Sequence, residues 1–213
     1  MFEIILSQKG YIKMSNIHEV RYLNKYTSLD REQLIDKISN VISENRFNHV
    51  LAVEETALNL AKKNDVDLEK TSLAALLHDI AKERSDEEMR DIIISENLDL
   101  EMLNFGSEIW HGPTGAVLSK REYGVHDEEI LDAIASHTVG ETQMSLLTQI
   151  IFVADYIEPN RDFKAAQIAR NLAKDSLKDA IKYILKETIK HLIREERTIY
   201  PKTIETYNAW LKM

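Results

Sequence analysis

The sequence contains no cysteine, and this absence excludes several kinds of chemistry at once. Disulfides, thiolate metal sites and cysteine nucleophiles all require that residue. Glycine and proline are also scarce, with 6 and 3 residues among 213. So few residues of the turn-forming kind argue against a sandwich or barrel of many short strands.

Long apolar runs and an excess of positive charge are missing as well. The longest apolar runs, Leu73–Leu77 and Ile150–Ala154, are far shorter than the ~18 residues that a membrane span needs. The formal net charge of −9 disfavours nucleic acid and anionic membranes as partners, because their phosphates attract basic surfaces. The first residues form no secretory signal, since Glu3 interrupts a very short apolar patch. We therefore expect a cytoplasmic protein.

The apolar residues that are present follow a helical pattern. They make up 44% of the chain, which is sufficient for one hydrophobic core. From Asp30 onward they recur with helical spacing, beginning with the stripe Leu34, Ile38, Val41 and Ile42. The sequence predicts an all-α helical bundle in one domain over residues 29–213. Residues 1–28 are an unassigned N-terminal extension, within which Met14 is a candidate alternative start.

Helices are predicted along nearly the whole of this domain. Ser85–Glu88 has the sequence of a capping box, and Pro113 suits the first turn of a helix. The expected segments are Phe47–Lys63, Leu68–Lys82, Ser85–Ile94, Pro113–Gly124, one starting at Asp127, Leu146–Tyr156, two charged helices within Phe163–Glu196, and one after Pro201. The stretch Asn97–Gly106 is expected to be looser.

Six residues of ligand type lie on apolar helix faces or at their ends: His49, His78, Asp79, His111, His137 and Asp155. A single histidine there is more often a hydrogen-bonded core residue, and a single aspartate can cap a helix. An ionised carboxylate on an apolar face is costly, however, unless it is paired or binds a cation. We therefore predict that the six form one cluster. The other histidines, His18, His126 and His191, are expected at the surface.

Four imidazoles and two carboxylates form a nitrogen and oxygen ligand set without sulfur. Such a set suits iron, manganese, cobalt or zinc better than calcium or magnesium. Six ligands exceed what one metal needs, and Asp79 beside His78 is the candidate bridge between two. Two metals, or one metal with a phosphate pocket beside it, are both compatible with this set.

Three basic residues lie close to these ligands in the sequence. Arg46 precedes His49 by three residues, Lys82 follows His78 by four, and Arg161 follows Asp155 by six. Each alone is more often a solvated charge. Together they predict a local positive pocket in an acidic protein, which is what a polyphosphate requires.

The six residues in this order resemble the H…HD…H…H…D signature of the HD-domain metal phosphohydrolases. The segments that carry a closer resemblance, to the YqeK-type bacterial symmetrical diadenosine tetraphosphate hydrolases, are Leu76–Lys82, Trp110–Pro113, Ser136–Thr138 and Phe152–Arg161. The likeness extends from Asp30 to the C-terminus. The turn Val139–Glu141 departs from it, since relatives show a more basic turn there. A Gly-Tyr-Pro element is absent, which disfavours the cyclic-dinucleotide branch.

The resemblance implies a role for each matching residue. Iron, as one or two ions with manganese, cobalt or zinc as substitutes, would be held by His49, His78, Asp79 and Asp155, with His111 and His137 lining the phosphate side or holding a second metal. The implied catalytic residues are Asp79, Lys82, His111 and His137. The implied substrate-binding residues are Arg46, Asp79, Ile80, Ala81, Lys82, His111, His137, Asp155, Tyr156, Arg161, Thr198, Ile199, Tyr200, Pro201, Lys202 and Thr203.

The function that follows is hydrolysis of diadenosine tetraphosphate to two ADP by attack of a metal-bound hydroxide. The expected partners are a dinucleoside polyphosphate, a product of the ADP or GDP kind and, as a candidate, a second copy of the chain. Two alternatives stay open. The substrate could be a guanosine alarmone or a deoxynucleotide, or the chain could be a catalytically silent nucleotide-binding helical module.

Overall fold

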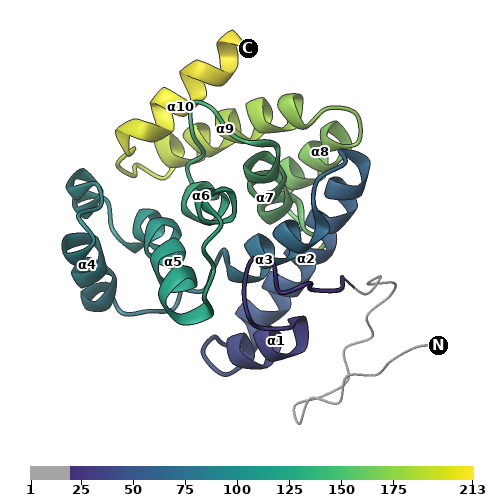
Figure 1. Ribbon diagram of the computed structural model, residues 1–213. Coiled ribbons are helices and arrows are strands. Elements are labelled where there is room, and N and C mark those ends of the chain that lie inside the picture. The colour runs from purple at the N-terminus through teal and green to yellow at the C-terminus, as the bar shows by residue number, and fades with distance from the viewer. Residues whose placement is uncertain (1–19) are drawn as a thin grey trace.

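A computed structural model describes residues 20–213, and over that range the chain forms ten α-helices, one 3₁₀ helix and no strand (Figure 1). The all-α fold class is therefore confirmed. No helix in the described range is long and apolar enough to cross a membrane. In chain order the elements are α1 (Arg31–Ser39), α2 (Glu44–Lys63), α3 (Leu68–Leu77), α4 (Asp86–Ser95), η1 (Leu100–Asn104), α5 (Ser107–Tyr123), α6 (Glu128–Ser136), α7 (Leu146–Ile157), α8 (Lys164–Ala173), α9 (Leu177–Arg194) and α10 (Pro201–Lys212).

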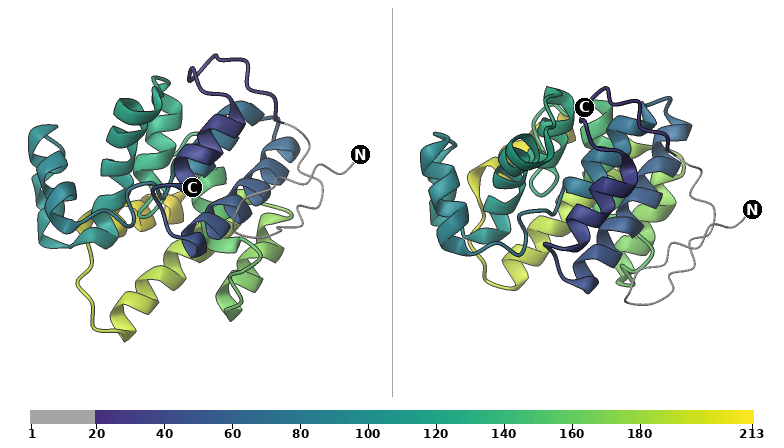
Figure 2. Two further views of the ribbon diagram at one scale, coloured as in Figure 1. Left: turned by 90° about the horizontal axis from the view of Figure 1, so that it is seen from below. Right: turned by 60° about the horizontal axis from the view of Figure 1, so that its bottom comes forward.

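Helix α3 is the centre of the bundle. Its run Leu73–Leu77 is fully buried, because α2, α6 and α7 all pack against it (Figures 1 and 2). Outside this centre, α5 packs on α6 and α4 on α5, while α9 packs on α7 and carries α8 and α10. The C-terminal end of α3 therefore lies inside the protein, and the residues that follow it, from His78 to Ala81, are buried as well.

Side-chain caps fix where several helices begin. Ser43, Asp67 and Ser145 each accept a hydrogen bond from a backbone N–H in the first turn of α2, α3 and α7. The Ser85 hydroxyl caps α4 in the same way, as predicted. The reciprocal half of the expected capping box is replaced by an ion pair, since the Glu88 carboxylate accepts from Arg84 at 2.8 Å.

Three predicted helix boundaries are wrong, and the first is the start of α2, which lies at Glu44 rather than Phe47. Helix α3 ends at Leu77 rather than Lys82, because the chain then tightens into turns, with N–H groups bonded three residues back. Helix α5 starts at Ser107, so Pro113 lies in its interior and not in its first turn. His111 therefore lies within α5 rather than at a helix entry. The stretch predicted to be looser contains η1.

The segment before α1 packs on the bundle where the structure describes it. The Tyr22 hydroxyl bonds Ser72 at 2.8 Å, the Tyr26 hydroxyl donates to Asp67 at 2.8 Å, and the Thr27 hydroxyl donates to the Tyr123 carbonyl at 2.6 Å. The division between an extension and the domain at residues 28 and 29 stays a prediction. Met14 and His18 lie outside the described residues.

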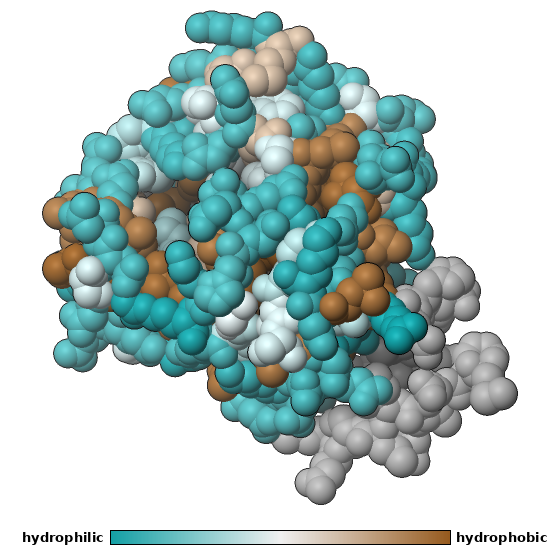
Figure 3. All heavy atoms as spheres, in the orientation of Figure 1, coloured by the Kyte–Doolittle hydropathy of each residue, from teal (hydrophilic) through white to brown (hydrophobic). Residues whose placement is uncertain are grey.

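The described surface is mainly hydrophilic, with apolar side chains in separate small groups on the face that Figure 3 shows. Val41, which the helical stripe placed inward, is 44% exposed because it follows the end of α1. A second apolar cluster, away from the main core, contains Met89, Ile93, Met102, Trp110 and Tyr200. It joins α4, η1 and the start of α5 to the connection between α9 and α10.

Candidate metal centre

The structure brings all six predicted ligand residues together. They come from α2 (His49), the turn after α3 (His78 and Asp79), α5 (His111), the end of α6 (His137) and α7 (Asp155). Three overlapping sets of three have ligand atoms within 4.8 Å of one another. Such spacing allows the members of each set to bind one ion.

Asp79 lies at the centre of this cluster, between two pairs of imidazoles. Its Oδ2 atom is 3.6 Å from His49 Nε2 and 3.5 Å from His78 Nε2. Its Oδ1 atom is 3.4 Å from His111 Nε2 and 3.5 Å from His137 Nε2. The two oxygens of one carboxylate therefore face two different pairs of nitrogen ligands.

Backbone carbonyls orient three of the four rings. His78 Nδ1 lies 2.7 Å from the Ala75 carbonyl oxygen, and His137 Nδ1 lies 2.7 Å from that of Ile134. A carbonyl oxygen only accepts, so each Nδ1 carries the proton and each Nε2 keeps its lone pair in the neutral ring. His111 Nδ1 faces the Ser107 carbonyl at 3.1 Å in the same way.

Two of the inward nitrogens are left without a hydrogen-bond partner. His49 Nε2 and His78 Nε2 are both buried and make no hydrogen bond, although Asp155 Oδ1 lies 3.0 Å from His49 Nε2. Buried polar atoms are nearly always satisfied, so an orphaned pair of imidazole nitrogens beside carboxylates needs an explanation. Binding of a metal ion would satisfy both atoms, and the residues present therefore fit a divalent metal.

Burial keeps two of the imidazoles neutral. It lowers the pKa of His78 to about 4 and that of His111 to about 3. Burial alone would raise the pKa of Asp79, but the surrounding imidazoles, His78 foremost, hold it well below its usual range. For His49, burial lowers the pKa, and contact with Asp155 outweighs this and raises it. Neutral imidazoles and ionised carboxylates are the forms that bind metals.

Close contact between α5 and α6 brings His111 beside His137. A Cβ atom at Gly112 would lie only 2.6 Å from the Ala135 carbonyl oxygen, so glycine permits this approach. The two Nε2 atoms are 3.0 Å apart, and the Thr138 hydroxyl lies 3.1 and 3.2 Å from them.

Glu158 is a residue of the site that the sequence analysis missed. Its Oε1 atom lies 3.2 Å from His49 Nδ1, and the side chain is buried. A carboxylate in this position orients the ring of a ligand and raises its basicity. Helical spacing could not have revealed it, because α7 ends at Ile157 and Glu158 follows in an extended conformation. Thr138 and Gly112 were also missed, and both depend on contacts between distant segments.

The three predicted basic residues surround the cluster, each paired with a carboxylate. Arg46 Nη1 is 2.5 Å from Asp79 Oδ2, and Arg161 Nη2 is 3.0 Å from Asp155 Oδ1. Lys82 Nζ contacts Glu108 at 2.7 Å instead. Ile80 and Ala81, between Asp79 and Lys82, are buried, and the half-buried Tyr156 packs its ring edge-to-face on Phe163.

The predicted loop Thr198–Thr203 connects α9 to α10. Its polar contacts reach the second apolar cluster, where the Tyr200 hydroxyl donates to Asp99 Oδ2 at 2.5 Å, and the turn at Glu141, which pairs with Lys202. Ile199 is half-buried and Thr203 buried, whereas Thr198 and Pro201 are exposed. His126 and His191 are exposed, as predicted.

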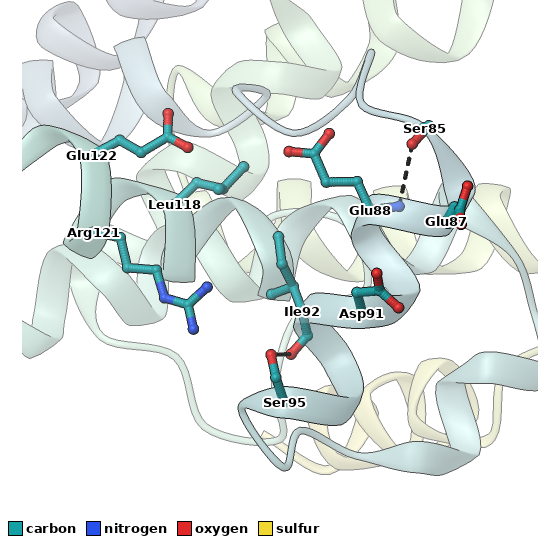
Figure 4. A pocket seen from close by; sticks show the side chains of 9 residues that line it. All are labelled: Ser85, Glu87, Glu88, Asp91, Ile92, Ser95, Leu118, Arg121 and Glu122. Atoms are coloured by element: carbon teal, nitrogen blue, oxygen red, sulfur yellow. Dashed lines mark hydrogen bonds between the residues drawn. The ribbon is translucent and has the colours of Figure 1, made fainter.

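A separate pocket lies between α4 and α5 and has a different character (Figure 4). Four carboxylates, from Glu87, Glu88, Asp91 and Glu122, line it together with Arg121. Its acidic lining does not suit a polyphosphate, and it contains none of the six clustered residues.

The six clustered residues lie within a segment of the chain that matches a known sequence family. Residues 46–160 match the family model of the HD domain. The chain therefore belongs to the HD-domain family, whose hydrolases bind divalent metals, and it has a cluster of histidines and aspartates that could hold such an ion. A solved structure from Clostridium acetobutylicum, described as a "predicted HD superfamily hydrolase involved in NAD metabolism", has a TM-score of 0.82 and 37% identity, over 85% of this chain and 96% of that one.

Comparison with curated relatives identifies a narrower family within the HD-domain proteins. The chain is 42% identical to a protein of Bacillus subtilis named "Bis(5'-nucleosyl)-tetraphosphatase, symmetrical", over 86% of this chain and 98% of the relative. A protein of the same name from Staphylococcus aureus is also 42% identical, over 79% of this chain and 88% of the relative. The chain belongs to this family, the YqeK-type symmetrical tetraphosphatases.

Proposed function

We propose that this protein hydrolyses diadenosine tetraphosphate symmetrically and releases two molecules of ADP. The observation that carries the proposal is the position of Asp79, whose two oxygens face two pairs of imidazoles. Relatives that are 42% identical to this chain are named for the symmetrical tetraphosphatase activity. A basic rim around an ionised cluster of this kind is suited to a polyphosphate and not to an uncharged substrate.

We propose iron as the metal, with His49, His78, Asp79 and Asp155 as its ligands. His111 and His137, which face the other oxygen of Asp79, would line the phosphate side or hold a second ion. When bound, the metal supplies an activated water and draws charge from a phosphate oxygen. Glu158 and the three backbone carbonyls would keep the ligand rings in place without reorganisation during the reaction.

The cationic side chains would bind the phosphates. Lys82, Arg46 and Arg161 now pair with carboxylates and would offset the charge of the tetraphosphate. The loop Thr198–Thr203 would hold one nucleoside diphosphate half, together with Lys82 and Arg161. The second phosphate of that half then reaches the metal-ligand cluster, and the group expelled is the other nucleoside diphosphate. Binding one half in this way produces a symmetrical cut.

A substrate panel combined with metal analysis tests the proposal. The purified protein is incubated with diadenosine tetraphosphate, a guanosine alarmone and a deoxynucleoside triphosphate, and early products are separated by chromatography. We expect turnover of the dinucleoside polyphosphate and a transition metal bound to the protein. Preferential turnover of either other nucleotide would overturn the substrate assignment.

A further inference from the structure

Lys82 is held by a carboxylate at the rim of the metal centre. Its ammonium lies 2.7 Å from Glu108 Oε2 and 3.4 Å from His111 Nδ1. The side chain of Lys82 is 21% exposed and that of Glu108 is 69% exposed, whereas His111 is buried. The carboxylate is therefore the more solvent-exposed partner of this ion pair, and the ammonium is the more buried one.

Positive charge from three segments acts on Glu108. Lys82 lowers the pKa of the Glu108 carboxyl most, and the charges of Arg197 and Arg46 lower it further. Arg46 belongs to α2, Lys82 to the turn after α3, and Arg197 to the connection between α9 and α10. A position where cations from three separate segments favour a carboxylate also favours a phosphate group.

We propose that the Glu108 carboxylate occupies a phosphate subsite at Lys82, on which the charges of Arg197 and Arg46 also act, and that it competes there with a phosphate of the nucleotide. The inference rests on the proposed function and adds Arg197 and Glu108 to it. An exposed ion pair contributes little free energy, so a phosphate can displace the carboxylate readily. When the carboxylate returns, it weakens the hold of Lys82 on a nucleoside diphosphate and aids the release of product.

The affinity of the metal-containing protein for ADP, measured by isothermal titration calorimetry, tests this competition. Glu108→Gln should bind ADP about three- to tenfold more tightly than the wild type, because the amide competes less well for Lys82. Glu88→Gln is the matched control, because it removes the same charge from a carboxylate on α4 that pairs with Arg84 at 2.8 Å. The control should leave the affinity for ADP within about twofold of the wild-type value.

A second background separates competition for Lys82 from a general effect of charge. In Lys82→Ala protein, the gain from Glu108→Gln should shrink, because the cation that the carboxylate blocks is gone. An equal gain in both backgrounds would overturn direct competition. Arg197→Ala should weaken ADP binding about two- to fivefold, whereas Arg194→Ala, which removes a charge paired with Glu195, should not.

The outcomes distinguish this inference from the proposed function. Turnover of diadenosine tetraphosphate with equal ADP affinity in the wild type and Glu108→Gln would overturn the competition alone. Absence of both turnover and ADP binding in the wild type would overturn the proposed function and the phosphate subsite together. Tighter binding in Glu108→Gln, not in Glu88→Gln, supports the subsite.

Discussion

Helix α2 contributes to two buried polar clusters, one shared with α3 and one shared with the turn after α3. Toward one end, the Glu54 carboxylate accepts hydrogen bonds from Arg31 Nε at 2.9 Å and from the Ser72 hydroxyl at 2.5 Å. Toward the other end, His49 and His78 face Asp79. Because His49 precedes Glu54 by five residues on α2, the clusters are only about 7.5 Å apart along the helix.

The first cluster is closed within the protein. Arg31 also pairs its Nη2 atom with Glu54 Oε2 at 2.5 Å, and the Tyr22 hydroxyl bonds Ser72 at 2.8 Å. Since the Ser72 proton goes to Glu54, the Tyr22 hydroxyl is the donor in its bond to Ser72. In the second cluster, two buried imidazole nitrogens make no hydrogen bond. The comparison indicates that the satisfied network stabilises the fold, whereas the two nitrogens of the second cluster are available to bind a metal ion.

The largest effect is expected when Asp79 is changed. Asp79→Ala removes the carboxylate shared by both pairs of imidazoles and should lower turnover about a thousandfold or more. His78→Ala should also remove most of the bound metal. Elemental analysis and activity assays on the folded variants check both effects. Full metal content in both variants would mean that the centre is misassigned.

A change in the Arg31–Glu54 network should lower the free energy of unfolding and leave metal binding unchanged. Arg31→Ala leaves the buried Glu54 carboxylate without its cation and should lower the free energy of unfolding by about 3–5 kcal/mol. Urea denaturation measures this loss. Metal content per folded molecule should stay at the wild-type level. A loss of metal without a loss of stability would reverse the roles that we assign to the two clusters.

Removing a basic side chain beside the cluster should lower the turnover of the nucleotide and leave the metal content unchanged. Lys82→Ala and Arg161→Ala each remove a charge-assisted contact worth about 1.5–3 kcal/mol, which corresponds to a loss of roughly ten- to a hundredfold in kcat/KM. Lys120→Ala, an exposed lysine on α5, is the matched control. Unchanged kinetics in both rim variants would favour solvated charges over phosphate-binding groups.

The smallest effect is expected from Glu158→Gln. The amide oxygen can still accept from His49 Nδ1, so the ring stays oriented and only the charge is lost. Metal affinity should fall about tenfold. Competition with a chelator of known affinity measures the change. A variant that keeps wild-type affinity would reduce Glu158 to a structural partner of the Asn160 N–H, which it bonds at 2.7 Å.

The sequence predicted the six clustered residues because each one is unusual beside an apolar run. The end of α3 could not be predicted in the same way, since Ile80 and Ala81 continue the apolar pattern beyond the helix. The early start of α5 was hidden by Pro113, which normally marks a first turn.

Contacts between distant segments were also out of reach. Glu158 lies 109 residues from His49 in the sequence, and the pair of Lys82 with Glu108 spans 26 residues. A helical pattern shows which face of a helix is inward, but not which side chain of another helix meets it. The partners of the ligands, unlike the ligands themselves, therefore required the three-dimensional structure.

The most direct test is the identity of the first products formed from diadenosine tetraphosphate. Chromatography of an early time point, with Asp79→Ala as the inactive control, separates ADP from ATP and AMP. Binding of a single nucleoside diphosphate half beside the cluster predicts ADP as the sole nucleotide product. Equal amounts of ATP and AMP would contradict it and would show that the roles of Lys82, Arg161 and the loop Thr198–Thr203 are misassigned.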